Sequence, residues 1–128
     1  MIGRILIVDD EVEFAEVMQE YIQMKGYEAE ISVDGPSAIK KIETFKPHLV
    51  LLDVHMPMMD GLEVLERISS QNRNIGIIMV TALRDDEIGR RALELGAADF
   101  ITKPVDVAYF EKSVLSKIVS VIGNDLED

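Results

Sequence analysis

The chain contains the stretch Leu49-Val50-Leu51-Leu52-Asp53-Val54-His55-Met56-Pro57-Met58-Met59-Asp60-Gly61. Its first four residues are apolar and lead without a polar break to Asp53, after which Met-Pro and Asp-Gly pairs turn the chain toward a new helix. A continuous apolar run is typical of a strand covered on both faces, as in parallel sheets. The residue after such a strand lies at the carboxyl edge of the sheet, where open α/β folds bind ligands. Asp53 is therefore the first candidate for chemistry.

Composition narrows the classes of function. The 128 residues include 13 Lys and Arg against 24 Asp and Glu, a formal net charge of −11, which disfavours direct binding to nucleic acid or to an anionic membrane. The absence of cysteine excludes disulfides, thiolate metal sites and cysteine nucleophiles. The first apolar run is too short for a signal peptide, and no run approaches the roughly 20 apolar residues of a membrane span. We expect a single domain in the cytoplasm.

Short apolar runs alternate with amphipathic stretches along the rest of the chain. They predict strands at 5–8, 27–32, 49–52, 75–80 and 98–102, each followed by a helix, the last of which spans 106–122. This alternation predicts right-handed βαβ units and a parallel sheet with helices on both faces. The expected fold is α/β, a flavodoxin-like doubly wound (βα)5 sandwich with a parallel five-stranded sheet in the order 2-1-3-4-5. Residues 1–122 would form the domain, and 123–128 an acidic C-terminal tail.

Apolar stripes mark the faces of the first and last predicted helices. The first helix carries its stripe at i, i+3, i+4, i+7 and i+8, on Phe14, Val17, Met18, Tyr21 and Ile22. The last helix has a stripe on Val107, Phe110, Val114, Ile118 and Val121, which Leu115, Val119 and Ile122 widen to about half the circumference. The wider stripe indicates either a deeply buried helix or a surface for a partner protein or a homodimer.

Polar residues follow four of the five predicted strands: Asp9 and Asp10, Asp53, Thr81, and Lys103. In the order 2-1-3-4-5 the switch point lies between the first and third strands, so the acids would meet in one crevice. Two carboxylates about 4 Å apart repel by roughly 4 kcal/mol at an effective dielectric near 20, so a cluster with a single lysine calls for a cation. Oxygen ligands without cysteine favour Mg²⁺, with Mn²⁺ as the alternative.

The same residues suit phosphoryl transfer. A carboxylate can act as the nucleophile, while a metal ion, a lysine and a hydroxyl stabilise charge on the phosphoryl oxygens. Asp53 is the best nucleophile because it stands alone at a central strand end. Asp10 and Asp9 are better suited to direct and water-mediated metal binding, respectively. The expected product is an aspartyl phosphate.

Four stretches of the chain resemble the receiver domain of two-component response regulators, in particular single-domain, chemotaxis-type regulators. They are Ile7-Val8-Asp9-Asp10-Glu11, Leu51 to Gly61, Val80-Thr81-Ala82, and Gly96-Ala97-Ala98-Asp99-Phe100-Ile101-Thr102-Lys103-Pro104. The resemblance covers nearly the whole chain, and the motifs occur in the right order at suitable spacing. It implies a signalling switch that catalyses only its own phosphorylation and dephosphorylation.

Site roles also follow from the resemblance. It implies that Asp53 accepts phosphate from a histidine kinase or a histidine phosphotransfer protein. Asp9, Asp10 and the backbone carbonyl of His55 would surround Mg²⁺ together with Asp53. His55 and Leu83 lie where the family tunes hydrolysis of the acyl phosphate. Leu83 offers no polar group to orient an attacking water, so we expect a long-lived phosphorylated form.

The resemblance further implies a switch and two contact surfaces. Thr81 and Lys103 would sense the phosphate, Phe100 would report the state, and Lys103-Pro104 would be a cis peptide. The face made by the fourth helix, fifth strand and fifth helix would then change shape for a downstream protein target. The phosphohistidine donor would dock beside the crevice, on Phe14, Ala15, Pro104 and Val105.

Other interpretations remain open for parts of the pattern. Asp9 and Asp10 alone suit a helix N-terminus, Phe100 suits the core, and His55 suits a solvated loop. A Mg²⁺-dependent phosphatase of the haloacid-dehalogenase type needs a second acid two residues after the nucleophile, where this chain has His55. A flavin or nucleotide module lacks its glycine-rich loop after the first strand. A receiver domain cut from a longer regulator with a DNA-binding or enzymatic output would look much the same as a single-domain regulator.

Overall fold

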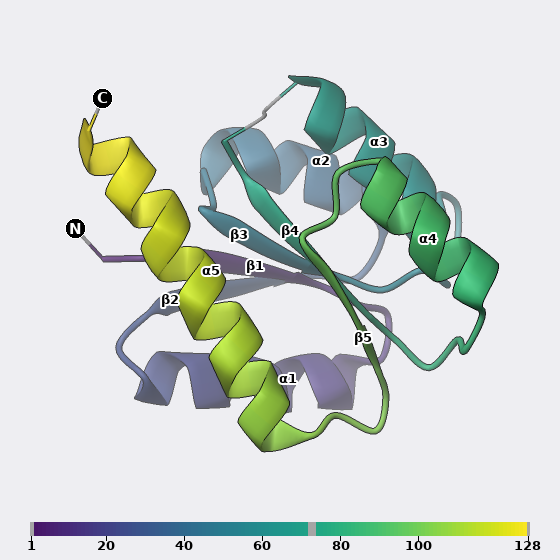
Figure 1. Cartoon of the computed structure of the whole chain (residues 1–128), viewed down its shortest axis with the longest axis horizontal. Coiled ribbons are helices and arrows are strands. Elements are labelled where there is room, and N and C mark those ends of the chain that lie inside the picture. Colours follow the sequence, from purple (N-terminus) through teal and green to yellow (C-terminus); the bar gives the residue numbers. More distant parts are fainter. Residues whose placement is uncertain (1, 72–73, 128) are drawn as a thin grey trace.

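The computed structural model describes residues 2–71 and 74–127 (Figure 1). Within these ranges the strands are β1 (Arg4–Val8), β2 (Glu28–Ser32), β3 (Leu49–Leu52), β4 (Gly76–Thr81) and β5 (Asp99–Thr102). The helices are α1 (Val12–Met24), α2 (Gly35–Thr44), α3 (Gly61–Gln71), α4 (Asp86–Glu94) and α5 (Val107–Glu127). All strand pairs are parallel, in the order β2-β1-β3-β4-β5. The predicted flavodoxin-like fold is confirmed.

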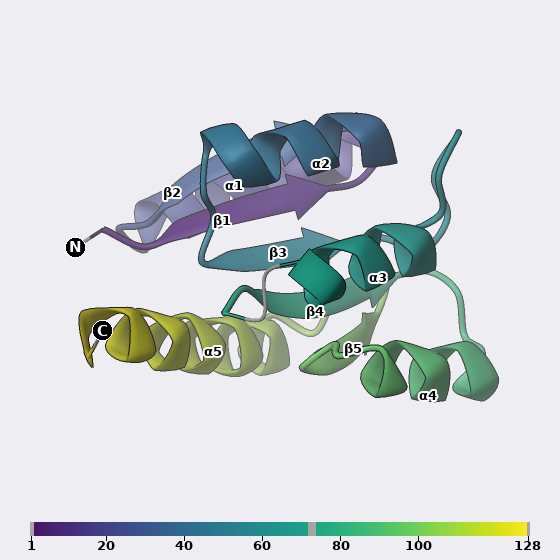
Figure 2. The ribbon, with the colours of Figure 1, turned by 90° about the horizontal axis from the view of Figure 1, so that it is seen from above.

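Helices cover both faces of the sheet (Figures 1 and 2). One core cluster joins α1 and α5 to alternate strand residues such as Ile5 and Ile7, all almost fully buried. A second cluster joins α2, α3 and α4 to the intervening residues, such as Leu6 and Val8. Because successive strand side chains point to opposite faces, a strand buried on both sides needs an unbroken apolar sequence. This requirement explains the run from Leu49 to Leu52.

The strand register carries the polar residues to one edge. In the β1–β3 pair Val8 lies opposite Leu52, and the backbone N–H of Asp53 donates to the Val8 carbonyl at 3.0 Å. The N–H of Asp9 similarly donates to the Ser32 carbonyl at 3.0 Å. These hydrogen bonds extend the pairing one residue beyond the strands. Asp9 and Asp53 therefore leave neighbouring strands at the same level.

Two helices differ in detail from the prediction. The α1 side chain of Val17 is 59% exposed, whereas Ala15, outside the predicted stripe, is fully buried. In α5, Val107 is 58% exposed, and the helix continues to Glu127 rather than ending at Ile122. Periodicity defines a face about 100° wide but not the residue at its centre, which packing decides. Gly123 weakens a helix by about 1 kcal/mol relative to alanine but does not stop its hydrogen bonding.

Gly61 provides a test of how tightly the end of β3 packs. A Cβ atom at Gly61 would lie 2.0 Å from the carbonyl oxygen of Asp53, which is backbone and cannot move aside as a side chain can. We expect Gly61→Ala to lower the free energy of unfolding by about 1–3 kcal/mol, the usual range for overpacking. Urea denaturation measures the change. Gly123→Ala is the control, since nothing lies within 4 Å of its Cβ; equal effects at the two positions would contradict the contact.

Candidate functional site

Three carboxylates gather at the carboxyl edge of the sheet. Asp9 and Asp53 are 2% and 6% exposed, and Asp10 is exposed. One oxygen from each of the three lies within 4.8 Å of the others. The predicted acid crevice between β1 and β3 is therefore present, with two of its acids withdrawn from water.

Lys103 reaches into this crevice from the end of β5. Its Nζ donates to Asp9 Oδ2 at 2.8 Å and to Glu11 Oε1 at 3.0 Å, and lies 3.8 Å from Asp53 Oδ2. The Phe14 ring covers the ammonium, with its centroid 4.1 Å from Nζ. Since an ammonium has three donors and no acceptor, it can serve several acids at once. Lys103 is thus the shared counter-ion of the site.

The direction of the pKa shift at Asp9 indicates that the Lys103 ammonium does not fully compensate the burial of this carboxyl. Burial raises the pKa of the Asp9 carboxyl above 3.8, against the opposing hydrogen bonds from Lys103 and from the Glu11 backbone. Burial alone would lower the pKa of Lys103, but its hydrogen bonds to Asp9 and Glu11 outweigh burial and raise it. The lysine therefore stays protonated, while Asp9 carries a charge that its surroundings disfavour.

The acid cluster fits a hard cation. Among the described residues, Asp53 Oδ1 is a buried side-chain oxygen with no hydrogen-bond partner. An unsatisfied buried carboxylate oxygen is costly, and a metal ion is one remedy. The donor set consists of oxygen atoms only, which Mg²⁺ prefers. Asp9, Asp10 and Asp53 are thus the residues that could hold such an ion.

The predicted sensing residues lie on β4 and β5. Thr81 is 1% exposed at the end of β4, and its Oγ1 accepts from the Leu83 N–H at 3.3 Å. Phe100 is half-buried and packs against the cluster shared by α2, α3 and α4. Its ring lies 3.8 Å from where a Cβ on Gly89 of α4 would stand. The Lys103-Pro104 peptide is cis, as expected.

An apolar groove of about 660 Å³ adjoins the site. Its apolar lining includes Phe14, Val17, Met18, Pro104, Val105 and Val107. Three of the predicted donor-docking residues, Phe14, Pro104 and Val105, therefore face one hollow. Ala15 does not, because it is 0% exposed on the buried side of α1. The groove explains why Val17 and Val107 are exposed although both are apolar.

The exposed apolar surface of α5 is narrower than the wide apolar stripe in its sequence predicted. Leu115 and Ile122 are half-buried and pack against the cluster shared by α1 and α5. Val119 is 62% exposed. Most of the extra apolar width therefore serves the core, and Val119 is the member left at the surface.

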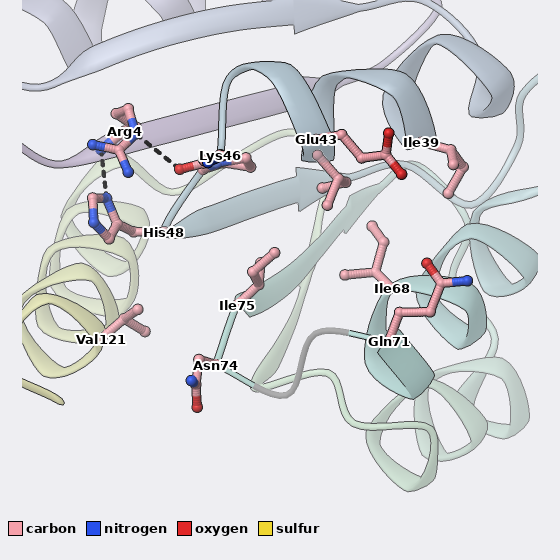
Figure 3. Close-up of a pocket in the computed structure, with 12 residues that line it drawn as sticks. Arg4, Ile39, Glu43, Lys46, His48, Ile68, Gln71, Asn74, Ile75 and Val121 are labelled. Atoms are coloured by element: carbon pink, nitrogen blue, oxygen red, sulfur yellow. Dashed lines mark hydrogen bonds between the residues drawn. The ribbon is translucent and has the colours of Figure 1, made fainter. Parts of the chain in front are cut away.

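A second large cavity lies at the opposite end of the sheet from the acids, where β1, β3 and β4 begin. Figure 3 shows residues that line it. It measures about 670 Å³ and is lined by Arg4, Lys46 and His48 among others. The Arg4 N–H donates to His48 Nδ1 at 3.0 Å, and Arg4 Nε donates to the Lys46 carbonyl at 2.8 Å. These contacts join β1 to the connection before β3. We assign them a structural role.

The strand order and the polar edge define a doubly wound α/β protein with an acidic, lysine-containing site. A family model described as the response regulator receiver domain matches residues 5–115. The chemotaxis protein CheY of Treponema pallidum is 36% identical over 122 residues, 93% of this chain and 82% of that protein. The receiver domain protein (CheY-like) of Methanospirillum hungatei superposes with a TM-score of 0.91 at 30% identity, over 97% of this chain and 99% of that one. The chain belongs to the response regulator receiver domain family.

Family membership fixes the general role. Response regulators of two-component systems receive phosphoryl groups from kinases and act on downstream targets, as signalling proteins rather than conventional enzymes. The transcriptional regulatory protein PhoP of Bacillus subtilis is 42% identical over 102 residues, 79% of this chain but only 42% of PhoP. The chain thus spans about half the length of several relatives. Among the described helices, none has the length and apolar character to cross a membrane.

Glu11 is the site residue whose contact the sequence did not predict. It was visible as the third acid after β1, but its pairing with Lys103 joins positions 92 residues apart. Its backbone N–H also donates to Asp9 Oδ1 at 2.9 Å. Glu11 therefore touches both the acid cluster and its counter-ion.

The buried charge of Asp9 leads to a prediction about stability. A carboxyl whose pKa is raised by folding destabilises the folded protein above that pKa, and the penalty disappears as the pH falls toward the unfolded value. We expect Asp9→Asn to raise the free energy of unfolding at neutral pH in metal-free buffer, with a gain that shrinks in acid. Urea denaturation over a pH series measures it.

Asp99→Asn is the matched control, for which we expect a change of opposite sign in the free energy of unfolding. Burial alone would raise the pKa of Asp99, but hydrogen bonds from Tyr109, Ser113 and the Phe100 N–H outweigh it and lower the pKa. Asp99→Asn should therefore lower stability at neutral pH, with a deficit that fades as the pH falls through the folded pKa of Asp99. A loss of stability in Asp9→Asn would show that its pair with Lys103 outweighs the cost of burial.

Proposed function

We propose that this chain is a phosphoacceptor switch in which Asp53 forms an aspartyl phosphate. The observation that carries the proposal is the placement of Asp53 at the end of β3, buried beside Asp9 and 3.8 Å from the Lys103 ammonium. A buried carboxylate with an unpaired oxygen, next to an ammonium, has the parts that phosphoryl transfer requires. The chain would catalyse only its own phosphorylation and dephosphorylation.

Asp9, Asp10 and Asp53, with the backbone carbonyl of His55, would hold Mg²⁺, or Mn²⁺ in its place. When bound, the ion would neutralise charge on the phosphoryl oxygens. Asp9 and Asp10 orient the ion at the edge, and Lys103 stays protonated to pair with the remaining oxygens. The gathering of three carboxylates, whose oxygens lie within 4.8 Å of one another, supports this assignment.

Thr81 and Phe100 form the proposed switch. Thr81 ends β4 at the carboxyl edge of the sheet, and Phe100 lies on the neighbouring strand against Gly89 of α4. A Thr81 hydroxyl drawn toward a phosphoryl group would leave room for Phe100 to turn inward. Gly89 lowers the stability of α4 by about 1 kcal/mol relative to alanine, which would help α4 to follow. The face made by α4, β5 and α5 would then present the change to a protein target.

The proposed donor is a histidine kinase or a histidine phosphotransfer protein that docks in the apolar groove. Phe14, Pro104 and Val105 line the groove next to Lys103, whereas Ala15 is excluded by its burial. We place the protein in the cytoplasm, with residues 1–122 as the receiver domain. A homodimer through α5 and attachment to a longer regulator remain alternatives for the output.

The geometry does not favour a phosphatase of the haloacid-dehalogenase type. That mechanism needs an acid two residues after the nucleophile to protonate the leaving group, and this position is His55, which is exposed to solvent. A signalling switch needs no such acid because the phosphorylated form is its product. His55 therefore favours the switch.

Incubation with a small acyl phosphate and Mg²⁺ tests the proposal. We expect one phosphate per chain, detected by intact-mass spectrometry and located on Asp53, because among the described carboxylates this one combines burial, an unpaired oxygen and a nearby ammonium. Asp53→Asn should abolish labelling, whereas Asp86→Asn, an exposed acid in α4, should not. Steady turnover of a phosphate monoester, or no labelling at all, would overturn the proposal.

The lifetime of the phosphorylated form depends on Leu83. Its side chain is half-buried beside Thr81 and has no polar group to orient an attacking water. We expect decay slower than seconds, and Leu83→Gln should accelerate it several-fold, on the order of 1 kcal/mol of barrier. Decay after removal of the donor measures both. A half-life of only seconds in the unchanged protein would show that hydrolysis does not need this residue.

A further inference from the structure

The Glu11 side chain is used in an unusual way for its position. Glu11 is the N-cap residue of α1, but its carboxylate accepts no capping hydrogen bond from the helix. Asp34 and Asp85, at the N-caps of α2 and α4, do accept such bonds. The Glu11 carboxylate instead accepts from Lys103, at 3.0 Å. The carboxylate of this exposed N-cap residue therefore pairs with Lys103 instead of capping α1.

This contact holds the ammonium on one side of the crevice. Nζ lies within hydrogen-bond distance of Asp9 and Glu11, but at 3.8 Å from Asp53 it is too far for a hydrogen bond. The Phe14 ring packs over the same ammonium. Glu11 is 61% exposed and lies outside the group of acids that could share a metal ion. Its carboxylate is therefore engaged by the lysine rather than by the metal site.

We propose that Glu11 is a positioning residue that holds Lys103 back from Asp53 before phosphorylation and so slows the reaction. The inference rests on the function proposed for Asp53. In the reaction, an Asp53 oxygen bonds to phosphorus while the bond from phosphorus to the donor atom breaks, and the donor atom keeps the electron pair. Lys103 stays protonated and must move toward the incoming phosphoryl oxygens. The Glu11 contact opposes that movement.

The size of the effect follows from the exposure of the pair. Solvent-exposed ion pairs contribute about 0–1 kcal/mol, which corresponds to at most about a 5-fold change in rate. Asp9 also holds the lysine, through the shorter and more buried pair, but it belongs to the acid cluster, so replacing it would change the candidate metal site as well. Glu11 can release the lysine without changing that cluster. It therefore tunes the rate without being required for the reaction.

Phosphorylation rates of Glu11 variants test this role. With a small acyl phosphate at fixed Mg²⁺, we expect Glu11→Gln to be labelled about 2–5-fold faster than the unchanged protein. Glu11→Asp keeps the charge but shortens the side chain, so it should also be faster if position matters. Glu16→Gln removes the same charge from an exposed position further along α1 and should have little effect. Because Glu11 is exposed, we expect all the variants to fold. Circular dichroism checks that they do.

A second measurement needs neither donor nor metal. Hydrogen bonds slow the exchange of ammonium protons with water, so the ¹⁵N-coupled signal of Lys103 reports its contacts. We expect faster exchange in Glu11→Gln and in Glu11→Asp, and no change in Glu16→Gln. Unchanged exchange, or labelling of Glu11→Gln at the rate of Glu16→Gln, would overturn the role of Glu11 alone. Absence of labelling on Asp53 in the unchanged protein would instead overturn the proposed function and the inference together.

Discussion

The parallel pairing of β1 with β3 is the constraint on which the site depends. With Val8 opposite Leu52, the residues that follow the two strands lie side by side, and both are aspartates. A slip of one residue would turn every side chain of one strand to the other face and bury the wrong set. The register is therefore fixed by the apolar side chains in the two core clusters. The packing that stabilises the sheet also sets the distance between the acids.

The charges at this edge of the sheet destabilise the folded state. Asp9 has a raised pKa, and an oxygen of Asp53 is buried without a described hydrogen-bond partner, so the folded chain holds charge where it is disfavoured. One ammonium is divided among Asp9, Glu11 and the more distant Asp53. Such unsatisfied groups persist in native proteins when the surrounding packing overdetermines them. Here the apolar strands supply that packing.

The sequence predicted the strand order and the acids at the edge because both follow from where apolar runs stop. It could not place features that depend on packing or side-chain conformation. Val17 and Val107 were expected to be buried, but helical spacing leaves the centre of a stripe undetermined by a residue or more. The sequence predicted no site residue at the end of the edge strand β2. The Ser32 carbonyl of this strand nevertheless accepts a hydrogen bond from the Asp9 N–H and so supports the crevice. The pairing of Glu11 with Lys103 depends on two flexible side chains from opposite ends of the chain.

Phe14 connects the site to its neighbouring surface. Its ring packs on the Lys103 ammonium at 4.1 Å and also lines the apolar groove between α1 and the start of α5. An aromatic ring that stabilises a cation does so through its face, so any shift of the ring changes the position at which the ammonium is most stable. A protein seated in the groove would touch this ring directly. Such a protein would therefore act on the position of the Lys103 ammonium through this one side chain.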